Sequence, residues 1–258
     1  MAKKFALLFP GQGTVKVGMG KDIYETYPEA KTIFNEADRI LGWPISEICF
    51  KGPLELLIKT VNTQLAVFIT NAAYSAVFRK EHKEKPVFLA GQSLGYFSAL
   101  LYSEVFSLKD GLKIVRKRAE LMEKQCLLNP GAMVAIKEPK NIPRIEHICQ
   151  KAGVVISNHN PHEIVVSGRV HLVNEAVEKI KKQGLVGRKM TIPLRTAGAF
   201  HSKLMTPVKA PLKKFISPYK FSDPTIPIIG NSKAQMIYTW RAAKREAIEH
   251  LDKPVLWQ

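Results

Sequence analysis

The sequence lacks any apolar run long enough to cross a bilayer, and it has few cysteines. No stretch approaches the roughly 20 apolar residues of a membrane span, so no membrane association is expected. The basic residues 1–5 lead straight into a strand pattern without a small-residue cleavage site, which argues against a signal peptide. Cys49, Cys126 and Cys149 are scattered, without Cys-x-x-Cys or zinc spacing. These absences predict a cytoplasmic protein with buried thiols and no metal site.

Acidic residues are also scarce, 22 against 39 lysines and arginines, which gives a formal net charge of +17. The basic residues are spread along the chain, and no zinc finger or aromatic RNA-binding motif accompanies them. This distribution argues against nucleic acid as the partner. An acidic protein partner or an anionic substrate would use the charge for electrostatic steering. Simple solubility is the alternative, and composition does not separate the two.

One stretch joins a short apolar run to a serine flanked by glycines. Residues 87–90 precede Gly91-Gln92-Ser93-Leu94-Gly95, and a helical pattern follows at once over residues 96–101. Strand, sharp turn and helix is the context in which such a serine becomes a nucleophile, because a strained turn exposes its hydroxyl. The new helix offers unpaired amides, that of Leu94 among them, to a developing negative charge. Ser93 is the candidate nucleophile, with an ordinary glycine-rich turn as the alternative.

Strand and helix patterns alternate through the first half of the chain. Residues 4–9 form a continuous apolar run, typical of a buried parallel strand, and end in the tight turn Pro10-Gly11-Gln12-Gly13. Gln12 would either be a solvated turn residue or project over a pocket at the carboxyl end of the strand. Helical patterns cover residues 24–41, 53–58 and 63–78. This order predicts an α/β fold with a parallel sheet.

The order of predicted strands and helices changes in the middle of the chain. Strand, helix, two strands, helix and strand follow in turn at residues 132–136, 142–152, 154–158, 164–167, 170–182 and 189–194. This is the ferredoxin-like β-α-β-β-α-β order. We predict a large α/β-hydrolase-like subdomain, residues 1–127 and 199–258, with an inserted small ferredoxin-like subdomain, residues 128–198. A cleft between the two would be the natural substrate site.

A helix is predicted after the capping sequence Ser107-Leu108-Lys109-Asp110, with apolar positions at helical spacing. Arg118 lies at the edge of that apolar stripe, among Lys113, Arg116 and Lys117. On spacing alone, a surface arginine is the favoured interpretation.

A serine nucleophile needs a base, and histidine suits that role because its pKa lies near neutrality. Of the seven histidines, four lie in polar surroundings and His159 is ambiguous; the four are His82, His147, His162 and His171. His201 is flanked by small and apolar residues in a loop that begins with glycine. It is the candidate base, and a satisfied core histidine would give the same pattern.

Five motifs now occur in a recognisable order. They are Leu8-Phe9-Pro10-Gly11-Gln12-Gly13, Gly91-Gln92-Ser93-Leu94-Gly95, Arg116-Lys117-Arg118-Ala119-Glu120-Leu121-Met122, Gly131-Ala132-Met133-Val134-Ala135-Ile136 and Ala199-Phe200-His201-Ser202. With these motifs the chain resembles the malonyl-CoA:acyl carrier protein transacylases over nearly its whole length. More narrowly, it resembles the free-standing acyltransferases that serve trans-acyltransferase polyketide synthases.

The resemblance implies a role for each matching residue. Ser93 would take the malonyl group from coenzyme A as an ester, with His201 as general base and then acid. The backbone amides of Gln12 and Leu94 would form the oxyanion hole. Arg118 would bind the free carboxylate of malonyl through its planar fork, which reverses the interpretation from spacing alone. No carboxylate partner for the histidine is implied.

Further pocket residues follow from the same resemblance. Gln64 matches a glutamine near the pocket, Phe200 fits the malonyl-selecting pattern, and His250 matches a position that orients the base. Two neighbours of the nucleophile depart from the family: Gln92 replaces a common histidine and Tyr96 a common glutamate. These departures would tune the pocket or change the substrate. The family also continues for a few dozen residues past the Pro-Val-x-Trp segment.

The implied reaction exchanges one thioester for another through an ester, so we expect no metal and no redox cofactor. The second substrate would be the phosphopantetheine thiol of an acidic acyl carrier protein, which gives the positive charge a specific use. Candidate docking residues are Lys181, Lys182, Arg188, Lys189, Lys213 and Lys214. We expect a monomer, in fatty acid or polyketide synthesis.

Three alternatives compete with malonyl transfer. A sister group of the family hydrolyses stalled acyl groups from carrier proteins and typically lacks the arginine, so Arg118 favours the transferase. A non-catalytic docking protein would use only the basic surface. A general α/β-hydrolase esterase would need an acidic triad residue, and the sequence places none.

Overall fold

The computed structural model of the chain describes residues 4–187 and 190–258, which form two compact units. Unit 1 comprises Met1–Glu120, Lys214–Gly230 and Gln235–Ala247. Unit 2 comprises Leu121–Lys213, Asn231–Ala234 and Ile248–Gln258. Arg188 and Lys189, two of the candidate docking residues, lie outside the described residues. The subdomain boundaries predicted at residues 128 and 198 stay a prediction.

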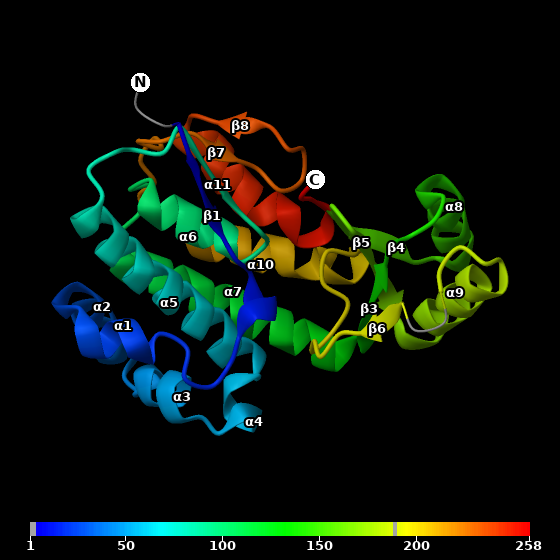
Figure 1. Ribbon diagram of the computed structural model, residues 1–258, viewed down its shortest axis with the longest axis horizontal. Coiled ribbons are helices and arrows are strands. Elements are labelled where there is room, and N and C mark those ends of the chain that lie inside the picture. Colours follow the sequence, from blue (N-terminus) through cyan, green and yellow to red (C-terminus); the bar gives the residue numbers. More distant parts are fainter. Residues whose placement is uncertain (1–3, 188–189) are drawn as a thin grey trace. The chain divides into compact units, whose positions relative to one another are not determined.

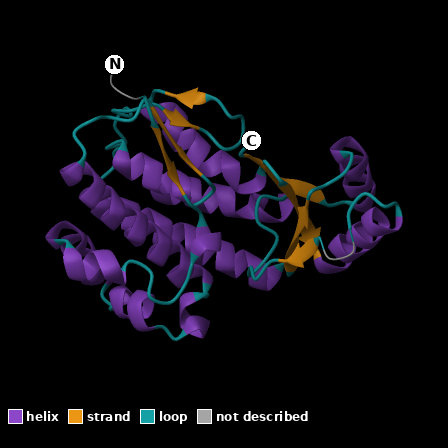
Figure 2. Cartoon of the chain, viewed as in Figure 1, coloured by secondary structure: helices purple, strands orange, loops and turns teal. Residues whose placement is uncertain are grey.

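Unit 1 is built on a four-stranded sheet in the order β1-β2-β7-β8 (Figures 1 and 2). Its strands are β1 (Ala6–Phe9), β2 (Phe88–Gly91), β7 (Ile228–Ile229) and β8 (Met236–Ile237). The first three run parallel, and β8 runs antiparallel to β7. Leu89, on the strand between β1 and β7, is fully buried. The short apolar runs of the sequence are therefore parallel strands, as predicted. The prediction that residues 4–9 are buried was wrong, because β1 lies at the edge of the sheet, where Phe9 is buried but Leu8 is 62% exposed.

Unit 1 contains the helices α1 (Lys21–Thr26), α2 (Pro28–Leu41), α3 (Ile45–Lys51), α4 (Leu54–Leu57), α5 (Thr60–Glu81) and α6 (Gly95–Tyr102), together with most of α7 (Leu108–Leu128) and of α11 (Trp240–Glu249). Helix α6 packs against β1 and β2, and α2 and α3 pack against α5. In α5 every residue from 63 to 73 is buried, so this helix is enclosed on all sides through that stretch. No helix in the described part of the chain is long and apolar enough to cross a membrane.

Two helical predictions were wrong in detail. The pattern over residues 24–41 is not one helix, because Pro28 stands at the first position of α2, where its missing amide donor costs nothing. The helix α3 (Ile45–Lys51) was not predicted. By contrast, the predicted cap of α7 (Leu108–Leu128) is present, since the Asp110 amide donates to Ser107 Oγ at 3.1 Å.

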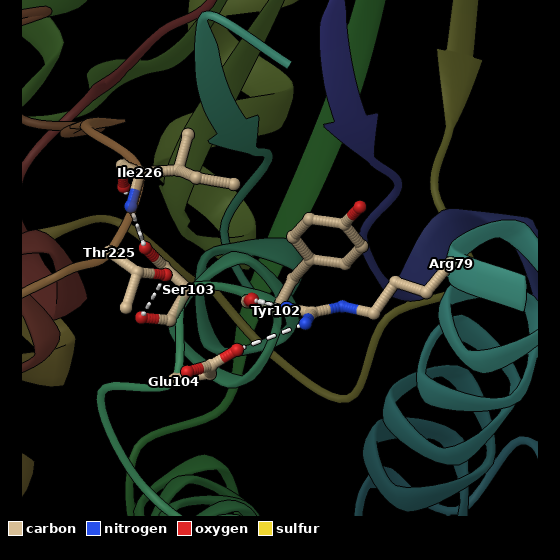
Figure 3. Close-up of polar contacts among 6 residues, drawn as sticks. All are labelled: Arg79, Tyr102, Ser103, Glu104, Thr225 and Ile226. Atoms are coloured by element: carbon tan, nitrogen blue, oxygen red, sulfur yellow. Dashed lines mark hydrogen bonds and ion pairs between the residues drawn. The ribbon is translucent and has the colours of Figure 1, made fainter. Parts of the chain in front are cut away.

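The carboxyl end of α6 is fastened from two sides (Figure 3). The fully buried Ser103 hydroxyl donates to the Ile226 carbonyl at 2.6 Å and accepts from the Ile226 amide at 2.8 Å. The Ser103 carbonyl accepts from the amide and the hydroxyl of Thr225. From α5, Arg79 donates to the Tyr102 carbonyl and lies over the Tyr102 ring. These contacts fix the helix that follows the Gly-x-Ser-x-Gly turn.

Unit 2 contains the β-α-β-β-α-β order that the sequence predicts. The elements are β3 (Gly131–Lys137), α8 (Ile142–Ala152), β4 (Val155–Asn160), β5 (Glu163–Arg169), α9 (Val170–Lys182) and β6 (Thr191–Pro193). The sheet order is β6-β3-β5-β4-β9, and the first four strands are antiparallel neighbours. The predicted fold class, with its ferredoxin-like part, is confirmed. The fifth strand, β9 (Val255–Leu256), adds parallel to β4 and was not predicted.

The core of unit 2 lies between this sheet and the two helices α8 and α9, which Figure 1 shows on one side of it. Ile136, Ile164 and Val166 from the strands meet Ile145 from α8 and Ile180 from α9. Apolar residues recur at helical spacing in both helices, which explains their single buried face. Unit 2 also contains the last part of α7, the short helix η2 (Lys203–Met205), the first part of α10 (Thr206–Ile216), the end of α11 and the short helix η3 (His250–Asp252).

A cavity of about 490 Å³ lies in unit 1 between β1 and α5. Its lining is mostly apolar and includes Leu7, Leu8, Met19, Val67 and Phe78. Ser93 is not among the lining residues, so this cavity is not the acyl pocket that the Gly-x-Ser-x-Gly motif predicts.

Candidate active site

Ser93 lies at the turn between the end of β2 and the start of α6. Its φ angle is +52°, in the left-handed region that a residue with a side chain occupies at a cost of about 1–3 kcal/mol. The predicted strained turn is therefore present. Such strain persists only where the surroundings impose it, and it marks functional residues more often than ordinary turns.

The two glycines of the motif are required by close backbone contacts. A Cβ atom on Gly91 would lie 2.1 Å from the backbone of Gly95, and one on Gly95 would lie 2.1 Å from the Phe9 carbonyl oxygen. Real Cβ atoms do not approach backbone atoms so closely. The prediction that glycines allow neighbouring segments to pack against the serine turn is confirmed.

Backbone amides gather beside Ser93. The amides of Gly95 and Tyr96 donate to the carbonyls of Gln92 and Ser93 in the first turn of α6. The amide of Leu94 has no acceptor among the described residues and is left for a ligand. The loop that contains Gln12 passes close by, because a Cβ on Gly11 would lie 2.7 Å from the Gln92 carbonyl oxygen.

Arg118 reaches the nucleophile from α7. Its Nη2 donates to Ser93 Oγ at 3.4 Å, and its Nη1 donates to Gln64 Oε1, on α5, at 2.5 Å. The guanidinium also lies over the ring of Phe97, with 5.4 Å from Cζ to the centroid. The residue is 0% exposed, so the surface position favoured by spacing is wrong. The predicted pocket residues Gln64 and Arg118 therefore share one site with Ser93.

The charge of Arg118 has no protein counter-charge. Nothing in the described chain pairs the guanidinium with a carboxylate, and its Nε has no hydrogen-bond partner there. Burial lowers the pKa of Arg118 from its ordinary value to about 9, so it remains charged at neutral pH. A buried charge without a partner is costly, and proteins keep one where a ligand supplies the opposite charge. The surroundings of Arg118 therefore suit an anionic ligand.

His201 lies in unit 2, in the loop between β6 and η2. It is 3% exposed and has a φ angle of +57°, a second left-handed residue with a side chain. Its Nδ1 is 2.8 Å from the backbone carbonyl oxygen of His250, and the two rings are 6.0 Å apart. A carbonyl only accepts, so Nδ1 carries the proton and Nε2 presents a lone pair, the tautomer that a general base needs.

Hydrogen bonds hold the loop on both sides of His201. Ser167 Oγ donates to the Phe200 carbonyl at 2.8 Å, and Ser202 Oγ donates to the Ala199 carbonyl at 2.7 Å. Phe200 itself is buried. Sequence reasoning included Ser202 in the motif around His201 but missed Ser167, since a buried serine on a strand carries no pattern that distinguishes it.

The nine predicted site residues divide between the two units. Unit 1 holds Gln12, Gln64, Gln92, Ser93, Leu94 and Arg118, and unit 2 holds Phe200, His201 and His250. Hydrogen bonds join Gln64 and Arg118 to Ser93 in unit 1, and the His250 carbonyl to His201 in unit 2. No cluster of metal-ligating side chains occurs within residues 4–187 and 190–258. Phe97, under the Arg118 guanidinium, was not predicted, although it lies one helical turn after Ser93.

Comparison with known proteins places this site in a family. The model of the acyl transferase domain matches residues 6–255. A malonyl CoA-acyl carrier protein transacylase of Bacillus subtilis is 38% identical over 99% of this chain and 81% of its own length. A polyketide biosynthesis malonyl CoA-acyl carrier protein transacylase of the same organism, PksC, is 34% identical over 97% and 85%.

Solved structures of such transacylases have the same fold as this chain. The acyl carrier protein S-malonyltransferase of Vibrio cholerae superposes with a TM-score of 0.92 at 33% identity, over 99% of this chain and 84% of that chain. A malonyl-transacylase in complex with a type II polyketide synthase acyl carrier protein gives 0.92 at 29% identity, over 99% and 83%. Fold, motif order and sequence identity point the same way, and the chain belongs to the acyl transferase domain family of malonyl-CoA:acyl carrier protein transacylases.

Proposed function

We propose that this acyltransferase moves a malonyl group from malonyl-CoA to the phosphopantetheine thiol of an acyl carrier protein, through an ester on Ser93. One observation carries the proposal. Arg118 is a buried cation without a protein counter-charge, 3.4 Å from Ser93 Oγ. A guanidinium binds a carboxylate in two parallel hydrogen bonds, so the pocket selects an acyl group that ends in a carboxylate.

The first half-reaction forms the ester. Ser93 Oγ attacks the thioester carbonyl while His201 Nε2 takes its proton, and the amides of Leu94 and Gln12 stabilise the oxyanion. The C–S bond then breaks, and His201 returns the proton to the coenzyme A thiolate. Arg118 holds the malonyl carboxylate throughout and fixes the reacting carbonyl over Ser93.

The second half-reaction reverses the first with a new thiol. His201 deprotonates the phosphopantetheine thiol, the thiolate attacks the Ser93 ester, and the serine recovers its proton. Nothing is oxidised or reduced, and each step exchanges one acyl bond for another, so these residues complete the cycle without a cofactor. All proposed groups come from one chain, and we propose a monomer that acts in the cytoplasm.

The relatives support an acyl carrier protein as the second substrate, since one neighbouring structure is a complex with such a protein. Their names include polyketide biosynthesis enzymes, and the proposal holds for either pathway. A net charge of +17 suits an acidic carrier.

Mass spectrometry of the intact protein after brief exposure to malonyl-CoA tests the proposal. We expect a mass increase of one malonyl group that is absent in Ser93→Ala and retained in Ser217→Ala, an exposed serine. Addition of a carrier protein should then remove the adduct and malonylate the carrier. Carrier binding without any adduct would support a docking protein instead. Rapid release of acetate from an acetylated carrier, with no malonyl loading, would support a hydrolase.

A further inference from the structure

The backbone carbonyl that orients His201 lies between two carboxylates that share one lysine. His250 is flanked by Glu249 and Asp252, and Lys209 on α10 approaches both. Its Nζ is 2.7 Å from Glu249 Oε2 and 3.1 Å from Asp252 Oδ1. Thr206 Oγ1 donates to the second Asp252 oxygen at 2.9 Å. The four-residue segment that contains His250 is therefore tied to α10 at both ends.

This ion-pair cluster is partly buried. The Lys209 side chain is 21% exposed and that of Asp252 10%, so solvent screens their interaction less than a surface pair. Burial alone would lower the pKa of Lys209, but its hydrogen bonds and charge interactions with Glu249 and Asp252 outweigh that effect and raise it. Lys209 therefore stays charged across the neutral range.

The segment continues directly from α11 (Trp240–Glu249), and its His250 and Leu251 are buried. The short helix η3 (His250–Asp252) itself has three residues, which is too few for a self-supporting helix, so its position depends on contacts with its surroundings. His201 is held in a strained backbone conformation, and its ring is oriented by the His250 carbonyl. If the carbonyl moved by about 1 Å, that hydrogen bond would weaken. The other tautomer of His201, with the proton on Nε2, would then also be populated.

We propose that Lys209 is a positioning residue for the general base: through Glu249 and Asp252 it holds the His250 carbonyl against His201 Nδ1 and so maintains the reactive tautomer. The proposal rests on the proposed function, in which His201 Nε2 takes the proton of Ser93. Lys209 touches neither substrate nor the reacting atoms, and it acts only through the segment 249–252.

Kinetics of the first half-reaction test the proposal with Lys209→Met and Lys209→Arg. We expect kcat for malonylation of Ser93 to fall about tenfold in Lys209→Met, with KM for malonyl-CoA within about twofold, because the base is misplaced while the binding site is intact. Lys209→Arg should restore kcat to within about threefold of the wild-type value. The control is Lys80→Met, which removes an ion pair of the same 2.7 Å length, with Glu29 in unit 1, and should leave both constants unchanged.

NMR of protein with ¹⁵N-labelled histidine supplies a readout that does not depend on activity. The His201 signals, assigned by their loss in His201→Gln, should show a single Nδ1–H tautomer in the wild type and a mixture in Lys209→Met. Asp252→Asn, which keeps the Thr206 contact and removes the charge pair, should also give a mixture and serves if Lys209→Met does not fold.

A single tautomer in folded Lys209→Met or Asp252→Asn, with unchanged kcat, would overturn the positioning role. A wild-type protein that shows the tautomer but never forms the Ser93 adduct would instead overturn the proposed function, so the two failures are distinguishable.

Discussion

At the scale of single residues, the candidate site consists of side chains that violate ordinary folding preferences. Ser93 and His201 occupy left-handed backbone conformations, and Arg118 is a fully buried cation without a counter-charge. Each feature costs stability, and none is needed for a packed core. Residues that keep such costs are expected where function requires them. Substitution of Arg118 allows the stability cost of its buried charge to be measured.

Replacement of Arg118 by methionine should stabilise the protein. Methionine fills similar volume and has no charge to desolvate, so we expect the free energy of unfolding to rise by about 1–3 kcal/mol at neutral pH. Because burial depresses the pKa of Arg118 to about 9, the cost is fully present below about pH 9 and is relieved as the pH rises from there towards the ordinary pKa of arginine. The gain from Arg118→Met should shrink over the same window. Urea unfolding at several pH values measures it.

The matched control is Arg116→Met, two residues away on α7, which removes an exposed ion pair with Glu120 and a cation–π contact with Trp43 and should lower stability by no more than about 1 kcal/mol. Arg118→Met should also lower kcat/KM for malonyl-CoA by about 100-fold while leaving acetyl-CoA almost unaffected. A destabilised Arg118→Met protein would mean that the hydrogen bonds to Gln64 and Ser93 outweigh desolvation. An unchanged acyl preference would remove Arg118 from substrate binding.

At the scale of elements, the position of the nucleophile depends on how α6 is held. This helix is only eight residues long and begins at Gly95, two residues after Ser93, so its own hydrogen bonds do little to fix it. Its carboxyl end is secured by the buried Ser103, with Thr225 and Ile226 before β7, and by Arg79 from α5 (Figure 3). Thr225 and Ile226 follow Ser103 by more than a hundred residues in sequence, so these contacts form only in the folded chain.

Ser103→Ala should therefore destabilise unit 1 more than a typical serine substitution. It leaves the amide and the carbonyl of Ile226 without the Ser103 hydroxyl in a buried site, which costs about 1–3 kcal/mol. Ser107→Ala is the control, because it removes an exposed helix cap that is worth about 1 kcal/mol. The midpoint of urea unfolding compares the two. Equal losses would show that water replaces the Ser103 hydroxyl and that the end of α6 is not fixed by it.

Elements with a clear period or a turn signal could be predicted from the sequence. The antiparallel strands of unit 2 and the two helices that cover them follow from apolar periodicity, and the serine turn follows from the spacing of Gly91 and Gly95. The break at Pro28 was missed because the apolar pattern continues through it. The strand β9 has two residues and no pattern of its own, and only its pairing with β4 defines it.

The candidate site was less accessible to sequence reasoning. Spacing placed Arg118 on the surface, because three neighbouring basic residues mark that side of α7 as solvated. Its burial depends on the packing of α5 and α6 against α7, which local patterns do not encode. Lys209 and its two carboxylates were not predicted, since residues 209, 249 and 252 meet only in the folded chain.

At the scale of the whole molecule, the dominant feature is the excess of positive charge. With +17 on 258 residues, the chain attracts any acidic macromolecule, and attraction of this kind acts mainly on the rate of encounter. Electrostatic steering weakens as salt shortens the Debye length. If the charge serves the carrier protein, its effect should appear in transfer to the carrier and not in transfer to a neutral thiol.

We therefore expect kcat/KM for transfer to an acyl carrier protein to fall about tenfold between roughly 0.1 M and 1 M salt, as the Debye length falls from about 10 Å to about 3 Å. Transfer from the same malonyl-enzyme to free pantetheine, which is uncharged, should change less than about twofold, because the chemistry at Ser93 is shared. Reversal of charge at the exposed Lys182 and Lys213 should weaken the dependence on salt for the carrier alone. Equal salt dependence for the two acceptors would assign the positive charge to solubility, since a docking surface acts on the carrier and on nothing smaller.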